Sequence, residues 1–169
     1  MKPKELIKST VVLTAICLIV AAALSATNYF TKDKIERSKA EATQAAMNEL
    51  VPGAKFSEIS EDSYSAEKDG DVCGYVFISE EMGYKSKIQV MTATDISGTV
   101  TGVCVTDCSN ESPGIGQKVG TEDSFTDLFK GQSKIASADA ITGATFSSDA
   151  VTKAVNNALE MYESVKGGQ

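Results

Sequence analysis

The chain has 169 residues, of which 42% are hydrophobic, and its formal net charge is −7. It contains no histidine, which excludes a Ser-His-Asp triad, a histidine-ligated zinc site and haem with an axial histidine. This length accommodates one compact domain and an appendage.

A long uncharged segment lies near the N-terminus. Residues 9–31 carry no charge over 23 positions, and residues 11–26 are almost wholly apolar. A helix needs about 20 apolar residues to cross a bilayer, so this segment is long enough to span. A cleaved signal peptide is the alternative, because a basic start precedes the apolar run and small residues follow it. We expect a retained membrane anchor, residues 1–30, because helix-forming sequence continues without a break.

Charge does not settle which side of the membrane the remainder occupies. Three lysines precede the apolar segment, and Lys32, Lys34, Arg37 and Lys39 follow it, so the positive-inside count is nearly balanced. Residues 1–30 hold three lysines and one glutamate, which leaves 13 basic and 22 acidic residues, a net charge of −9, for the rest. Nucleic-acid binding requires clustered Lys and Arg, so we expect no nucleic-acid partner.

Past the anchor, residues 29–50 are rich in Ala, Glu, Lys and Gln, which favour a helix. Pro52 and Gly53 end it. We interpret residues 31–53 as a helical stalk that leads to a domain of residues 54–169.

Strand patterns dominate the middle of the chain. Residues 72–79 form an apolar and aromatic run, and residues 87–94 alternate between apolar and polar side chains. A short turn at residues 95–98 separates them from a third β-branched run, residues 99–106. Two such runs joined by a Gly-containing turn predict an antiparallel hairpin.

Helices are expected after the strands. Residues 124–129 predict a short helix closed by Gly131, and residues 149–165 predict a long final helix. Apolar residues recur along that helix at helical spacing: Val151, Ala154, Val155, Ala158, Leu159, Tyr162 and Val165. The sequence therefore predicts an α+β fold with an antiparallel sheet and a long C-terminal helix.

Three cysteines lie outside the apolar segment: Cys73, Cys104 and Cys108. We expect small core or strand residues kept as thiols. A disulfide between Cys104 and Cys108, or between Cys73 and Cys104, remains open. Without histidine the ligand set for a metal is thin, and no metal site is expected.

A hydroxyl-rich turn directly precedes the final helix. Ser147 or Ser148 is placed to cap this helix by accepting hydrogen bonds from its first N–H groups. The same helix end is suited to a phosphate, since its donors are unpaired and partly positive. Small residues, Gly143 and Ala144, would let a ligand approach the backbone.

The stretch Asp139-Ala-Ile-Thr-Gly-Ala-Thr-Phe-Ser147 resembles the flavinylation motif of the FMN-binding domain family. The family includes the G component of the Rnf electron-transport complex and the C component of the sodium-pumping NADH:quinone reductase. There the last hydroxyl residue of the motif is esterified by the FMN phosphate. The resemblance implies that Ser147 is the acceptor and that Thr145 and the N-terminal end of the final helix hold the phosphate; the adjacent Ser148 is a competitor. Thr142, Gly143 and Ala144 also match the motif and are expected to bind the cofactor.

A second stretch, Glu111-Ser-Pro-Gly-Ile-Gly116, resembles the family's loop against the flavin ring. By resemblance, Glu111, Ser112, Pro113, Gly114, Ile115 and Gly116 would shape the ring pocket. Gly83-Tyr84 and the residues 50–54 also resemble family features, so the likeness runs through most of the chain. The chain is most similar to the RnfG proteins of Rnf complexes.

The resemblance implies an electron-transfer subunit of an ion-translocating ferredoxin:NAD oxidoreductase that carries FMN through a phosphoester and turns over no substrate alone. Its partners would be the other subunits of a membrane complex and a flavin transferase. The transferase acts outside the cytoplasm, which implies a single pass through the bacterial cell membrane with a cytoplasmic N-terminus and an extracytoplasmic FMN domain. A solitary extracytoplasmic flavin carrier and a tethered non-redox binding module are the alternatives.

Overall fold

The computed structural model describes residues 3–167. Its first element is one uninterrupted helix, α1 (Pro3–Leu50), which takes in both the expected anchor and most of the expected stalk. The described part of α1 contains a stretch that is long and apolar enough to cross a membrane by length and composition. Two compact units are present, one ending at Ala42 and the other beginning at Thr43.

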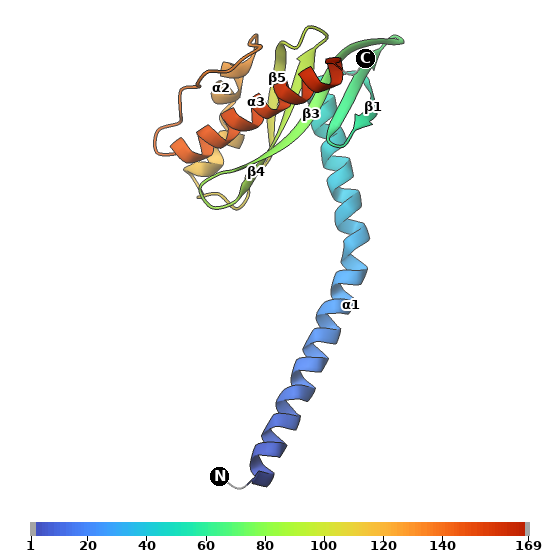
Figure 1. Ribbon diagram of the computed structural model, residues 1–169, viewed down its shortest axis with the longest axis vertical. Coiled ribbons are helices and arrows are strands. Elements are labelled where there is room, and N and C mark those ends of the chain that lie inside the picture. The colour runs from blue at the N-terminus through green and yellow to red at the C-terminus, as the bar shows by residue number, and fades with distance from the viewer. Residues whose placement is uncertain (1–2, 168–169) are drawn as a thin grey trace. The chain divides into compact units, whose positions relative to one another are not determined.

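The second unit is built on a five-stranded sheet (Figure 1). The strands are β1 (Lys55–Ser60), β2 (Ser63–Lys68), β3 (Asp71–Met82), β4 (Lys87–Asp95) and β5 (Val100–Asp107). They follow each other in the sheet in chain order, and every neighbouring pair is antiparallel. The expected antiparallel sheet is therefore confirmed.

Two tight connections define the hairpins on either side of β4. Between β4 and β5, the Asp95 carboxylate accepts hydrogen bonds from the N–H groups of Ser97 and Thr99, at 2.8 and 2.9 Å. Gly98 adopts a φ of +88° in this turn, a conformation that side chains disfavour. Between β3 and β4, the N–H of Gly83 donates to the carbonyl of Ser86, so residues 83–86 form a compact turn at the end of the hairpin.

One face of the sheet is covered by the C-terminal helix, α3 (Thr145–Gly167). In Figure 1 this red helix crosses the sheet, with α2 (Asp123–Thr126) beside it. Ile88 and Val90 of β4 pack against Val151 and Val155 of α3 in the main core. Short 3-10 helices, η1 (Gly116–Gly120) and η2 (Asp127–Phe129), complete this layer. The start of α3 is thus fixed against both the sheet and η1.

The opposite face is closed within the same unit by the last turn of α1. Ala46 and Met47 are buried there against Val76 and Met91, with Leu50 at the edge of the cluster. Burial of these side chains removes apolar surface from water and stabilises the sheet on its second side.

Two features differ from the expectations. β1 and β2 were not predicted, because their Ser-, Glu- and Lys-rich sequences lack an apolar run. α3 begins at Thr145 rather than near residue 149, so both serines lie inside its first turn. The Ser residues looked like caps outside the helix, whereas both side chains are buried.

Candidate functional site

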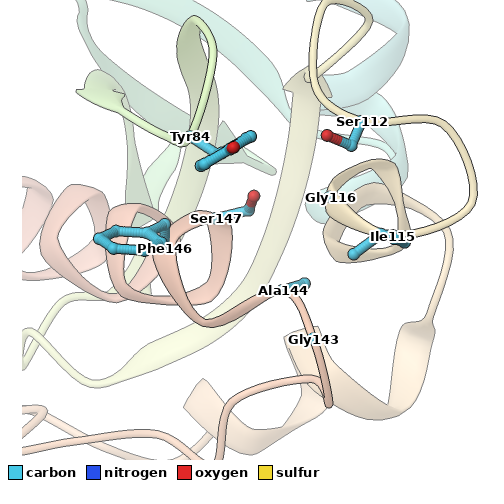
Figure 2. Close-up of a pocket in the computed structure, with 8 residues that line it drawn as sticks. All are labelled: Tyr84, Ser112, Ile115, Gly116, Gly143, Ala144, Phe146 and Ser147. Atoms are coloured by element: carbon cyan, nitrogen blue, oxygen red, sulfur yellow. The ribbon is translucent and has the colours of Figure 1, made fainter.

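Three segments distant in sequence enclose a cavity of about 420 Å³. They are the β3–β4 turn, the loop that follows β5, and the turn that leads into α3. Figure 2 shows the hydroxyl of Ser147 pointing from the first turn of α3 into the space opposite Ser112 and Ile115. The cavity is lined by Tyr84, Ser112, Ile115, Gly116, Gly143, Ala144, Phe146 and Ser147.

The side chain of Ser147 is tied to the loop after β5. Its Oγ donates a hydrogen bond of 2.6 Å to Oε2 of Glu111. Each of the two residues is only 1% exposed. A hydroxyl bonded to an ionised carboxylate at this distance makes a short, charge-assisted hydrogen bond.

A fully buried carboxylate is uncommon and needs several hydrogen bonds. Glu111 receives three from one turn: the N–H of Tyr84 donates to Oε2 at 3.2 Å, and those of Lys85 and Ser86 donate to Oε1 at 2.8 and 3.0 Å. Burial raises the pKa of Glu111, but the hydrogen bonds from Ser147 and these amides outweigh burial and hold the pKa below its ordinary value. Glu111 is therefore a carboxylate at neutral pH.

Two glycines leave the space that Glu111 fills. A Cβ on Gly116 would lie 2.9 Å from both Glu111 Oε2 and Ser147 Oγ. A Cβ on Gly83 would lie 3.0 Å from Glu111 Oε1 and 2.7 Å from Ile88. The absence of side chains at these two positions allows the Ser147–Glu111 pair to form.

The rim of the cavity is apolar and exposed. Tyr84 and Phe146 are 64% and 68% exposed, and their ring centroids lie 6.1 Å apart with the rings tilted by 38°. Ile115 is also exposed on the loop after β5. Aromatic faces of this kind suit a planar ring, because offset stacking adds to the burial of apolar area.

The turn into α3 corrects the capping prediction. Ser148 Oγ accepts the N–H of Ile141 at 3.1 Å, and the N–H of Ala144 donates to the carbonyl of Ile141. Gly143 has a φ of +82°, which lets the chain reverse before the helix. Neither serine is an N-cap: Ser148 fastens the preceding turn, while Ser147 is directed toward Glu111.

The predicted site residues do not all lie at the cavity. Six of them line it: Ser112, Ile115, Gly116, Gly143, Ala144 and Ser147. Glu111 lies behind the wall, bonded to Ser147. Thr142, Thr145, Pro113 and Gly114 are exposed and belong to the same two segments without lining the cavity. Tyr84 and Phe146 line it although the sequence assigned neither to the site; both are exposed aromatics, and Phe146 holds the variable position of the motif.

None of the four cysteines lines the cavity, and all four are free thiols. Burial raises the pKa of both Cys104 and Cys108. Within residues 3–167 no group of three or more Cys, Asp or Glu side chains is arranged to hold a metal ion.

Two protein-family models match parts of the chain. The model of the FMN-binding domain matches residues 83–160, which include every residue that lines the cavity. The model of the RnfG N-terminal region matches residues 1–50.

Whole-chain relatives agree with these matches. The G component of the Na⁺-translocating ferredoxin:NAD⁺ oxidoreductase complex of Acetobacterium woodii is 31% identical, over 96% of this chain and 94% of its own. The G component of the proton-translocating complex of Clostridium ljungdahlii is 30% identical, over 93% and 91%. The crystal structure of Shewanella oneidensis NqrC has the same fold, with a TM-score of 0.53 and 21% identity over 69% of this chain and 70% of that one. The chain therefore belongs to the RnfG family, the G components of ion-translocating ferredoxin:NAD⁺ oxidoreductase complexes.

Proposed function

We propose that the chain is the electron-transfer subunit of a membrane-bound ion-translocating ferredoxin:NAD⁺ oxidoreductase, with FMN held in the cavity by a phosphoester to Ser147. The observation that carries the proposal is the position of the Ser147 hydroxyl, which faces the cavity from the first turn of a helix. When bound, FMN supplies the capacity to take up and return one or two electrons.

The residues at this helix end fit a phosphate. α3 is 23 residues long, and the N–H groups of its first three residues have no carbonyl partner within the helix and carry partial positive charge. Gly143 and Ala144 add almost no bulk where the chain enters α3, so a phosphate can come close to the backbone. Esterification of Ser147 would fix the phosphate at this end of the cavity.

The rim fits the planar ring system. Tyr84 and Phe146 on one side and Ile115 on the other offer apolar surface that a flavin ring would cover. Ser112 supplies a hydroxyl to the same cavity for the polar edge of the ring. These side chains would orient the ring and exclude water from part of it, which tunes its redox potential.

The helix α1 supports attachment to a membrane. Its side chains at Leu18, Ile19 and Leu24 are about two-thirds exposed, which is costly in water and favourable in lipid. We propose a single pass with the N-terminus in the cytoplasm and the FMN domain outside it. A covalent link is useful there, because a dissociated flavin would be lost. The partners are the other subunits of the complex and a flavin transferase that attaches FMN.

The names of the relatives agree on the reaction of the complex but differ in the ion that it transports. The Acetobacterium woodii complex is named for Na⁺ and that of Clostridium ljungdahlii for protons. Their shared reactants, ferredoxin and NAD⁺, are proposed here for the complex to which this subunit belongs.

The attachment is tested by intact-protein mass and visible absorption after co-expression of the full chain with a flavin transferase. We expect a mass increase equal to FMN minus water and a flavin spectrum that persists after denaturation. Ser147→Ala should abolish both. Ser148→Ala is the matched control, since it removes a neighbouring buried hydroxyl that faces Ile141 instead of the cavity, and it should keep the label. An unlabelled wild-type chain, or label lost in Ser148→Ala but kept in Ser147→Ala, would refute the proposed attachment.

A further inference from the structure

The hydroxyl that we propose as the FMN acceptor already contacts a base. A serine hydroxyl is a weak nucleophile at neutral pH and is activated by an adjacent group that takes its proton. Such a group must lie within about 2.6 to 3.2 Å of the hydroxyl oxygen. Glu111 Oε2 lies 2.6 Å from Ser147 Oγ.

We propose that Glu111 is the general base of flavinylation, so that the chain supplies this catalytic group for its own modification. The inference rests on the proposed attachment of FMN to Ser147. The general base would then belong to the protein that receives FMN and not to the flavin transferase.

The step requires an activated phosphate donor. Direct condensation of free FMN with serine would release a water molecule, which is unfavourable in aqueous solution. A flavin dinucleotide, in which riboflavin phosphate forms a phosphoanhydride with a nucleoside phosphate, meets this need. Ser147 Oγ forms a bond to the phosphorus of the riboflavin phosphate. The P–O bond to the second phosphate breaks, and the nucleoside monophosphate leaves with the electron pair. The Oγ proton passes to Glu111 Oε2 and then to solvent; no electron is transferred.

The two carboxylate oxygens of Glu111 have different hydrogen-bond partners. Oε1 is held by the amides of Lys85 and Ser86. Oε2 accepts the longer bond from the amide of Tyr84 and the short bond from Ser147. The first oxygen therefore fixes the carboxylate on the β3–β4 turn, and the second is left to receive the proton.

The same hydrogen bonds keep Glu111 ionised, which a base must be before it acts. They also weaken it as a base, because they hold its pKa low. A weak base is adequate here, since the acidity of the Oγ proton rises steeply once Oγ begins to bond to phosphorus. The carboxylate is thus charged and correctly placed in advance, and no side chain has to move to take the proton.

Charged and titratable groups lie on each segment around the pair. They include Asp107 and Cys108 at the end of β5 and the start of the loop, Tyr84 and Lys85 on the β3–β4 turn, Lys118 on η1, and Asp149, Lys153, Glu160, Tyr162, Glu163 and Lys166 on α3. Burial raises the pKa of the Cys108 thiol, and the charges of Asp107 and Glu111 raise it further. Cys108 is therefore a neutral thiol at neutral pH and does not compete for the Ser147 proton.

The test measures the rate of label incorporation into the full-length chain in detergent, with purified flavin transferase and flavin adenine dinucleotide, by intact mass. Glu111→Gln should lower the rate by about 10² to 10⁴, the usual contribution of a general base. The ratio of the Glu111→Gln rate to the wild-type rate should rise with pH, because hydroxide and buffer replace the missing base. Glu111→Asp keeps a carboxylate and should recover part of the rate. Glu122→Gln, which changes a partly exposed glutamate paired with Lys118, is the control and should match wild type.

The outcomes separate the two proposals. Label on Ser147 of wild type with an equal rate in Glu111→Gln would overturn the role of Glu111 and leave the attachment intact. A slower Glu111→Gln whose ratio to wild type is independent of pH would also overturn it, since a purely structural defect predicts that result. An unlabelled wild-type chain would instead count against the attachment itself. If Glu111→Gln fails to fold by circular dichroism, Glu111→Asp decides: a rate equal to wild type would contradict the role, because the shorter side chain withdraws the base from Oγ.

Discussion

Gly116 lies directly against the carboxylate of Glu111, so close that a Cβ at position 116 would meet Oε2 at 2.9 Å. The same Cβ would meet Ser147 Oγ at 2.9 Å. This glycine therefore determines whether the Glu111–Ser147 hydrogen bond can form. Its φ is outside the left-handed region, so space and not backbone conformation is what requires glycine here.

Replacing Gly116 with Ala should separate the pair. We expect the free energy of unfolding to fall by about 1 to 3 kcal/mol, the usual result of overpacking a filled site. FMN attachment should also slow, because Oγ is pushed from its base. Urea denaturation and the labelling rate measure the two effects. Gly167→Ala is the control, since its Cβ would meet nothing within 4 Å; equal stability of the two variants would contradict the packing argument.

The pH dependence of stability should report the ionisation of Glu111. The hydrogen bonds hold its folded-state pKa below the ordinary value of 4.5, so the unfolded chain binds the proton more readily. The stabilisation is complete above an ordinary glutamate pKa and is lost as pH falls through the folded value. The difference in unfolding free energy between wild type and Glu111→Gln should therefore be constant above about pH 5 and shrink in acid.

Urea titrations from neutral pH into the acid range provide this measurement. The pKa of Asp95 is also lowered, chiefly by the hydroxyl of Ser97 and with burial opposing, and contributes acid sensitivity to both proteins. That contribution cancels in the difference. A difference that stays constant down to the acid limit would show that Glu111 is not selectively stabilised as a carboxylate.

Sequence patterns predicted the elements that carry a strong apolar signal. The β-branched runs correspond to β3, β4 and β5, and the spacing of Val151 and Val155 identified the buried face of α3. β1 and β2 were not predicted because their side chains are mostly polar; β2 is held by backbone pairing to β3, and β1 by backbone pairing to β2. The start of α3 was placed too late because serines before a helix are usually caps.

The sequence predicted which segments form the site but not which side chains contact each other within it. The motif located Ser147, yet nothing in the sequence shows that a glutamate 36 positions away accepts its hydrogen bond. The resemblance placed Glu111 at the flavin ring, whereas its side chain lies behind the cavity wall; charged side chains are rarely fully buried. Its burial depends on three amides of the β3–β4 turn, a contact that only the folded sheet creates.

Tyr162 joins α3 to the β4–β5 turn, and its removal should loosen that end of the helix. Its hydroxyl donates to the carbonyl of Ile96 at 2.9 Å, and its ring covers Gly98. Tyr162→Phe should cost about 1 kcal/mol for the hydrogen bond. Tyr162→Ala should cost about 3 to 5 kcal/mol for the ring. Urea denaturation measures both losses of unfolding free energy, and replacement of the exposed Tyr84 with Phe is the control. Equal losses in the two Tyr162 variants would contradict the assignment of the larger part to the ring.

The exposed ring of Phe146 should matter only when the cofactor is present. Without FMN, Phe146→Ser should change the unfolding free energy by no more than about 0.5 kcal/mol, as for other surface positions. With FMN attached, the variant should shift the flavin absorption band, because one apolar wall of the ring site is lost. Ile96→Ser, a similarly exposed residue remote from the cavity, should leave the band unchanged. A flavin spectrum identical to wild type in Phe146→Ser would place the ring elsewhere.

The side of the membrane on which the FMN domain lies can be tested through Cys73, which is an exposed free thiol on β3. A membrane-impermeant maleimide added to intact cells should label it if the domain is extracytoplasmic. Cys104 and Cys108 are half-buried and should react more slowly, and Cys17 lies within the apolar helix, where lipid would shield it. Cys73→Ser should therefore remove most of the label. Labelling that appears only after the cells are permeabilised would reverse the proposed orientation, since the reagent would then have had to cross the membrane to reach Cys73.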